Sequence, residues 1–292
     1  THADAVVIGS GIAGLTSAAL LAQAGHKVVV LERDVHPGGC AAGWTQDGYR
    51  FAVGATVAMG FEQGGAHRKI YERLGLEPRY VEVNPAIRVH LPDRTVEVKK
   101  THAEWFKEVA EKFPGGTENK LAYWREVRQL AGAMYYVSRH FPVMPFKNLQ
   151  DVLDTARGAH PKLLPVFLHL WKTVKQRLEH FGINDKAHKA FIDGQLLDAM
   201  QTTSDDCVAV NGAFALDIYR FGCQYKIGGL ESVAKDLATY VTSHGGEVRY
   251  ATRAKAIFND NGVVKGVATN RGDIDAPVVI SAIPLENTSE LL

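Results

Sequence analysis

The sequence is poor in cysteine and in long apolar runs. Only three of its 292 residues are cysteine, Cys40, Cys207 and Cys223, and no two of them form a Cys-x-x-Cys pair. An odd count at this spacing argues against a disulfide framework and against a zinc site, so we expect a reducing compartment and no bound metal. No stretch reaches the roughly 18 consecutive apolar residues that a membrane-spanning helix needs.

The sequence also lacks an excess of charge of either sign. Lys and Arg together number 33, Asp and Glu 32, and the 12 His residues show no metal-binding spacing. No global positive field favours nucleic acid, so we expect no nucleic-acid partner. The apolar start of the chain runs directly into a glycine motif rather than into a signal-peptide cleavage site, and we therefore expect a cytoplasmic protein.

What the sequence does contain falls into three zones. Residues 1–83 are rich in glycine and strand-like, residues from about 100 to 200 carry apolar residues at helical spacing, and residues 224–292 return to strands. We therefore expect an α/β protein in which 1–83 and 224–292 form one discontinuous domain. The intervening residues 84–223 form an inserted, mainly helical region.

A β-α-β unit opens the chain. Residues 5–8 form a short apolar run typical of a buried parallel strand, and residues 9–14 (GSGIAG) follow at once. Residues 15–24 favour a helix that Gly25 ends, and residues 27–31 form the second strand. The alternative to a dinucleotide-binding motif is a glycine-rich turn that binds no ligand. Such a turn does not require a strand before it, a helix after it and a second strand that ends in an acidic residue.

Each glycine of this motif has a physical role in binding a dinucleotide. Gly9 permits the tight turn, Gly11 lets a pyrophosphate approach the backbone, and Gly14 lets the helix pack on the strand. The helix N-terminus offers free N–H groups to the phosphates. Glu32 ends the second strand, where a carboxylate accepts from ribose hydroxyls and repels a 2′-phosphate. NAD and FAD both fit this pattern, whereas NADP does not.

A second glycine pair separates NAD from FAD. Glu32 and Arg33 are followed by Gly38, Gly39 and Cys40, which resembles the second glycine signature of the flavoproteins with two dinucleotide-binding domains. Most members of that group have Arg where this chain has Cys40. A thiol beside a flavin is one interpretation of Cys40, but we expect a small buried residue.

Residues 48–56 (GYRFAVGAT) extend the resemblance to the phytoene desaturase superfamily, and residues 57–61 (VAMGF) are most similar to its carotenoid isomerase branch. The resemblance implies FAD as cofactor, a Rossmann-like FAD-binding domain, and a flavin ring near residues 53–61. The residues expected to bind the cofactor are Gly9, Ser10, Gly11, Ile12, Ala13, Gly14, Glu32, Arg33, Gly38, Gly39, Cys40, Gly54, Ala55, Thr56, Ala254 and Ser281.

The C-terminal zone resembles the same superfamily. In residues 225–233 (YKIGGLESV) a glycine pair opens a helix, as in the family's return segment into the FAD domain. The resemblance implies that the backbone of Ala254 touches the adenine. Asn261 and Gly262 predict a hairpin turn, and residues 278–282 (VVISA) return to the main sheet.

Family members usually run on to a glycine-rich segment that closes over the flavin, and we do not find it here. We therefore expect either an incomplete piece or a partner chain that supplies the missing C-terminal half. The resemblance implies an FAD-dependent oxidoreductase that acts on a lipophilic polyene, by hydride transfer to the flavin or by isomerisation with reduced flavin. The alternatives are an oxidase or dehydrogenase of a non-carotenoid small molecule, and a half-enzyme subunit. No catalytic side chain is assigned.

Apolar residues recur at helical spacing in residues 164–181 and predict an amphipathic helix. Its apolar face belongs either to the core, which we favour, or to a peripheral membrane contact. The aromatic pairs at 105–106, 123–124 and 135–136 fit a polyene tunnel or, more commonly, an aromatic core. Asp205 and Asp206 predict a turn or a helix cap rather than a metal pair.

Overall fold

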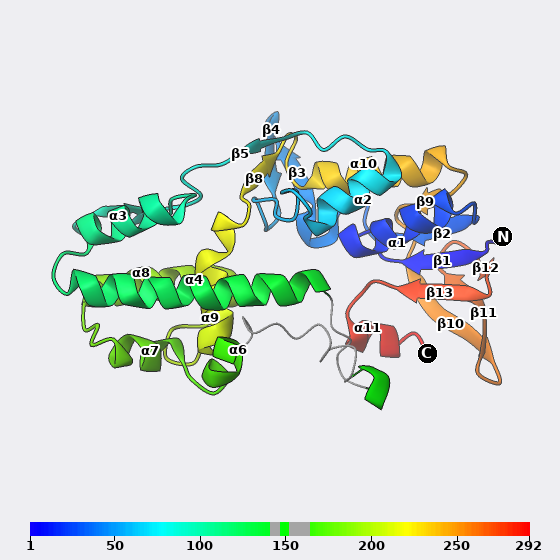
Figure 1. Cartoon of the computed structure of the whole chain (residues 1–292). Coiled ribbons are helices and arrows are strands. Elements are labelled where there is room, and N and C mark those ends of the chain that lie inside the picture. Colours follow the sequence, from blue (N-terminus) through cyan, green and yellow to red (C-terminus); the bar gives the residue numbers. More distant parts are fainter. Residues whose placement is uncertain (141–146, 152–163) are drawn as a thin grey trace. The chain divides into compact units, whose positions relative to one another are not determined.

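The computed structural model of the chain describes residues 1–140, 147–151 and 164–292. It divides into two compact units, one of residues 1–82 and 224–292 and the other of residues 83–223. We describe each unit by itself. The first is a Rossmann-like α/β unit and the second is mainly helical, so the expected fold class is confirmed (Figure 1).

A four-stranded parallel sheet with the order β13-β1-β2-β9 lies at the centre of the first unit. Its strands are short runs of Val, Ile and Leu, and every residue of β1 and β2 is buried. Helix α1 connects β1 to β2, as the glycine motif predicts. The four strands and this helix are β1 (Ala5–Ile8), α1 (Ile12–Gln23), β2 (Val28–Leu31), β9 (Glu247–Arg249) and β13 (Val278–Ser281).

Different layers cover the two faces of this sheet because successive side chains of a strand point in opposite directions. Val7 and Val30 pack with helices α1, α2 (Ala66–Leu74) and α10 (Glu231–Ser243). Val6 and Val29 pack on the opposite face against an antiparallel meander. The meander consists of β10 (Ala254–Asp260), β11 (Val263–Thr269) and β12 (Ile274–Asp275).

Two short ribbons and a terminal helix complete the first unit. The predicted hairpin turn is confirmed between β10 and β11, where Asn261 and Gly262 both have positive φ. The glycine pair at 228–229 precedes α10, also as predicted. The remaining elements are η1 (Gly39–Ala41), β3 (Gly43–Gln46), β4 (Tyr49–Ala52), β5 (Tyr80–Glu82), β8 (Gln224–Lys226) and α11 (Leu285–Ser289).

The second unit is built mainly from helices around an aromatic core. Trp105, Tyr123, Trp124 and Phe191 are each at most 2% exposed, so these aromatic residues belong to the core rather than to an open tunnel. The elements are β6 (Arg88–His90), β7 (Thr95–Glu97), α3 (His102–Lys112), α4 (Thr117–His140), α6 (Leu164–His169), α7 (Val174–His180), α8 (Lys186–Met200), α9 (Ala209–Asp217) and η3 (Ile218–Arg220).

The single amphipathic helix expected over residues 164–181 is wrong. The chain forms two helices, α6 and α7, because Thr173 starts a new helix with a capping box in which its side chain accepts from the Gln176 N–H. The expected apolar face is split as well. Val174 and Leu178 are buried, whereas Leu168 is 66% and Trp171 89% exposed.

Two further expectations concern metals and membranes. Asp205 pairs with Lys175 and Lys189 and is exposed, as suits a surface turn. Within residues 1–140, 147–151 and 164–292, no group of His, Cys, Asp and Glu side chains is arranged to hold a metal ion. In the same residues no helix combines the length and the hydropathy required to cross a bilayer.

Candidate functional site

The glycine loop lies at the carboxyl end of β1, where ligands bind in open parallel sheets. Gly9 has φ of 100°, a left-handed conformation that favours glycine. A Cβ on Gly14 would stand 2.1 Å from the Gly9 carbonyl oxygen, so only glycine allows α1 to approach the loop this closely. By contrast, a Cβ on Gly11 would meet no atom of the described structure within 4 Å. The loop is therefore packed behind Gly14 and open in front of Gly11.

Helix α1 presents bare backbone donors at this open side. Gly11 is its N-cap residue and, in the described structure, no side chain caps the helix. Its first turn holds Ile12 and the exposed Ala13, with no acidic residue. The first N–H groups of a helix have no partner within the helix, and the helix dipole adds partial positive charge. This N-terminus is suited to bind a phosphate group.

Glu32 lies beside the loop and is 8% exposed. Its Oε2 accepts from the N–H of Ser10 at 2.9 Å and from the hydroxyl of Ser10 at 2.5 Å, and its Oε1 accepts from the N–H of Asp34 at 2.9 Å. The carboxylate is thereby fixed at the end of β2. Burial, and after it the charge of Glu32, raises the pKa of Tyr250.

The second glycine pair packs directly against the first loop. The N–H of Gly38 donates to the carbonyl oxygen of Ser10 at 2.9 Å, and Gly38 forms a parallel bridge with Gly11. Gly38 and Gly39 have φ of 127° and 55°, and a Cβ on Gly39 would lie 3.4 Å from the Cα of Gly11. The first glycine loop and the second glycine pair, which are separate in the sequence, are therefore in contact in the structure.

The remaining residues that were expected to bind the cofactor have fewer contacts with the first glycine loop. Ser281, at the end of β13, pairs with Ile8 and so lies at the same edge of the sheet. Gly54 lies beside the Cys40 carbonyl oxygen, which an added Cβ would approach to 3.6 Å. The residues that no described contact joins to the loop are Arg33, Ala55, Thr56 and Ala254, of which the first three are exposed.

The expectation that Cys40 is a small buried residue is wrong. Cys40 is exposed in the short 3₁₀ turn η1, none of whose residues is buried. The two buried cysteines are Cys207 and Cys223, and burial raises the pKa of both thiols.

The sequence analysis did not identify three residues that make contacts in this unit: two donate hydrogen bonds to Glu32, and one joins β4 to α10. The Thr252 N–H donates to the Glu32 carbonyl oxygen at 2.7 Å, and Asp34 donates to the carboxylate. Bonding of an acidic side chain to the N–H two residues on is a local signal that could have indicated Asp34. Arg50 of β4 forms an ion pair with the buried Glu231 at the start of α10, and no sequence spacing predicts that pair.

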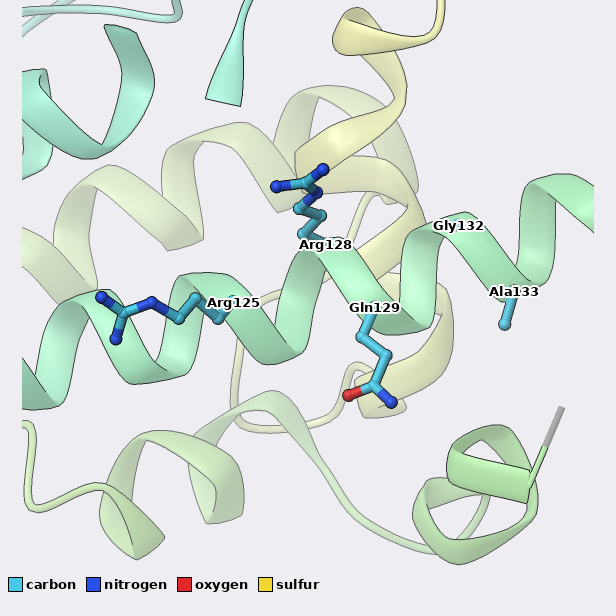
Figure 2. Close-up of a pocket in the computed structure, with 5 residues that line it drawn as sticks. All are labelled: Arg125, Arg128, Gln129, Gly132 and Ala133. Atoms are coloured by element: carbon cyan, nitrogen blue, oxygen red, sulfur yellow. The ribbon is translucent and has the colours of Figure 1, made fainter. Parts of the chain in front are cut away.

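A separate recess of about 470 Å³ lies on α4 in the helical unit. It is lined by Arg125, Arg128, Gln129, Gly132 and Ala133 (Figure 2). Figure 2 shows that the two arginine side chains leave the helix in different directions, so they do not converge on one ligand group. None of the residues expected to bind a cofactor lines this recess.

A glycine loop, a bare helix N-terminus and a fixed carboxylate indicate a dinucleotide site, and comparison with known proteins decides its kind. Residues 12–292 match the family of flavin containing amine oxidoreductases. The chain belongs to this family. Its cofactor is FAD, and the resemblance to phytoene desaturases and carotenoid isomerases is confirmed by its relatives.

Among the relatives is the chloroplastic prolycopene isomerase of Daucus carota, 30% identical over 287 residues, which cover 95% of this chain and 45% of that one. A neurosporene-forming phytoene desaturase of Rhodobacter capsulatus is 28% identical over 95% of this chain and 52% of that one. The all-trans-retinol 13,14-reductase of Rattus norvegicus is 26% identical over 99% and 48%. The chain spans about half the length of these curated relatives.

Solved structures share the fold. A protein from Pyrococcus furiosus aligns with a TM-score of 0.66 and 18% identity over all of this chain and 61% of its own. A putrescine oxidase triple mutant aligns with a TM-score of 0.66 and 17% identity over all of this chain and 60% of its own. At these identities the likeness concerns the fold alone.

Proposed function

We propose that this chain carries the FAD-binding portion of an oxidoreductase that isomerises or desaturates a lipophilic polyene. The observation that supports the substrate class most directly is the 30% identity with a prolycopene isomerase across 95% of the chain. Phytoene and retinol, named in other relatives, are isoprenoid polyenes as well. The putrescine oxidase likeness extends to the fold only, so it does not favour an amine substrate.

The chain's own residues would hold the cofactor through its ADP half. Gly11 and the first N–H groups of α1 would bind the pyrophosphate, and Glu32 would accept from the adenosine ribose. Gly38 and Gly39 would lie along the cofactor as it passes the first loop. When bound, FAD supplies the redox chemistry: it accepts hydride in a desaturation, or in its reduced form promotes isomerisation.

Substrate class and cofactor can be tested together in one assay. The purified chain, loaded with FAD, is incubated in liposomes with prolycopene and a reductant that keeps the flavin reduced, and separately with phytoene and an electron acceptor, and the products are separated by chromatography. Conversion to all-trans product without net oxidation supports isomerase activity, whereas product with more conjugated double bonds, formed only with an added electron acceptor, supports desaturation. A preparation that binds FAD but converts neither prolycopene nor phytoene argues against the polyene substrate.

We also propose that the site is completed by polypeptide that corresponds to the unmatched part of the relatives, in the same chain or in a partner. The support is that this chain covers only 45% of the carrot relative. Adding that polypeptide should raise FAD affinity and activity together. If it changes neither, these 292 residues suffice for the site and the proposal of a completing polypeptide is wrong.

A third proposal is peripheral membrane contact through the C-terminal end of α6 and the exposed residues that follow it. Trp171 is 89% exposed, Leu168 66% and Phe167 64%, and Lys172 follows them in sequence. Exposed aromatic and aliphatic side chains next to a cation suit the membrane interface, where a lipophilic substrate would be collected.

A further inference from the structure

Ser10 lies between two glycines of the first loop, yet its side chain does not face the open side of that loop. The residue is 0% exposed, and its hydroxyl donates to Glu32 Oε2 at 2.5 Å. Its backbone N–H donates to the same oxygen at 2.9 Å. Two donors of one residue thus bind one carboxylate oxygen of the residue that directly follows β2.

The hydrogen bonds of Glu32 leave a defined place for a ligand. An ionised carboxylate offers about four acceptor positions, two on each oxygen. Ser10 occupies both positions on Oε2, and the Asp34 N–H occupies one on Oε1. In the described structure, one position on Oε1 has no donor. The carboxylate is therefore held in one rotation, with its remaining acceptor on the oxygen that Ser10 does not touch.

We propose that Ser10 is a positioning residue that orients Glu32 toward the ribose hydroxyls of the cofactor and does not contact the phosphates through its side chain. This inference rests on the proposed cofactor site. Hydrogen bonds to charged acceptors are short and directional, so losing the hydroxyl lets the carboxylate rotate about its remaining bonds. The Ser10 hydroxyl would then contribute to affinity only for ligands that carry the ribose hydroxyls.

The experiment compares two probes, ADP and 2′,3′-dideoxy-ADP, by calorimetric titration of the purified chain. Ser10→Ala should bind ADP roughly tenfold more weakly than the unaltered chain and dideoxy-ADP within about twofold of it. Ser17→Ala is the matched control, because the Ser17 hydroxyl donates to the Ala13 carbonyl oxygen within α1 and does not touch Glu32. It should leave both affinities unchanged.

A second variant keeps the test decisive if Ser10→Ala folds poorly. Ser10→Cys keeps the shape of the side chain with a somewhat larger atom in place of the hydroxyl oxygen, and it donates only a weak hydrogen bond, so it should shift the ratio of the two affinities in the same direction. In a Glu32→Gln background, Ser10→Ala should cause little further loss of ADP affinity, because both changes remove the same interaction.

Three results would overturn the inference. Equal weakening of both probes would assign Ser10 a merely structural role, tighter ADP binding would show that its hydroxyl competes with the ribose, and unchanged ADP binding would show no role in recognition. If the unaltered chain binds neither FAD nor ADP, the proposed cofactor site itself is wrong, and the inference falls with it.

Discussion

Two glycines three residues apart in the first loop should respond in opposite ways to the same substitution. A Cβ on Gly14 would lie 2.1 Å from the Gly9 carbonyl oxygen and 3.1 Å from the Ala282 Cβ, and backbone cannot give way as a flexible side chain can. Overpacking of this kind costs about 1–3 kcal/mol, and a backbone clash belongs at the upper end. Gly14→Ala should therefore lower the free energy of unfolding by about 3 kcal/mol.

Gly11→Ala should leave the fold intact and abolish cofactor binding. Gly11 has φ of −65°, which alanine adopts readily, and its Cβ would project into space that no described atom occupies within 4 Å. Alanine is a poorer N-cap residue than glycine, which destabilises the fold, but it also makes the unfolded chain less flexible, which stabilises the fold. These two effects nearly cancel, so the free energy of unfolding should change by less than about 0.5 kcal/mol. The methyl group would block the close approach of the pyrophosphate, and FAD should bind about a hundredfold more weakly or not at all.

Both effects are measured on the same preparations, by urea unfolding of the cofactor-free chain and by quenching of flavin fluorescence. Gly132→Ala on α4 is the control, since its Cβ would also meet no described atom within 4 Å and it lies in the other unit. The reasoning is refuted if Gly11→Ala binds FAD like the unaltered chain, or if Gly14→Ala is as stable as Gly11→Ala.

Two other predictions concern the helical unit. Burial, with the charge of Lys120 second, lowers the pKa of His188 to about 3 from 6.5, so the folded chain binds fewer protons than the unfolded chain between these values. The stability that neutral His188 contributes is complete above pH 6.5 and is lost as the pH falls toward 3, by about 2 kcal/mol at pH 5. The free energy of unfolding, measured with urea, should therefore fall by about 2 kcal/mol less between pH 7 and pH 5 in His188→Gln than in the unaltered chain. An equal fall in both proteins would contradict this prediction. Trp171→Ser should reduce sedimentation with anionic liposomes severalfold and change stability by less than about 0.5 kcal/mol. Tyr49→Ser, at a residue 72% exposed in the other unit, is its control, and equal losses in both variants would exclude a specific contact.

The first β-α-β unit could be predicted almost completely because its signals are local. A buried strand, three glycines with distinct steric roles and a terminal acid specify the loop in sequence order, and the structure places them as expected. The hairpin at Asn261 and Gly262 was predictable for the same reason, since positive φ at both residues is a property of the turn itself. Contacts between distant segments were harder, and only the resemblance indicated that the second glycine pair would belong to the same cofactor site.

The failures occurred where tertiary packing or a capping signal competes with periodicity. Apolar spacing continues through residues 164–181, but Thr173 and Gln176 form a capping box that starts a new helix, and that pattern is visible in the sequence. The exposure of Cys40 depends on which elements pack over its turn, which no local pattern encodes. The hydrogen bond between the Ser10 hydroxyl and Glu32 was not predicted for a similar reason, because the two residues lie 22 positions apart.

The central claim is that the loop at Gly9–Gly14 and Glu32 bind the ADP half of FAD, and a competition titration tests it most directly. The purified chain is saturated with FAD and then titrated with ADP, and FMN, which lacks the AMP part of FAD, is tested in parallel. The account predicts stoichiometric FAD binding, displacement by ADP and no comparable binding of FMN. FMN binding as tight as FAD binding, or FAD that ADP does not displace, would contradict it.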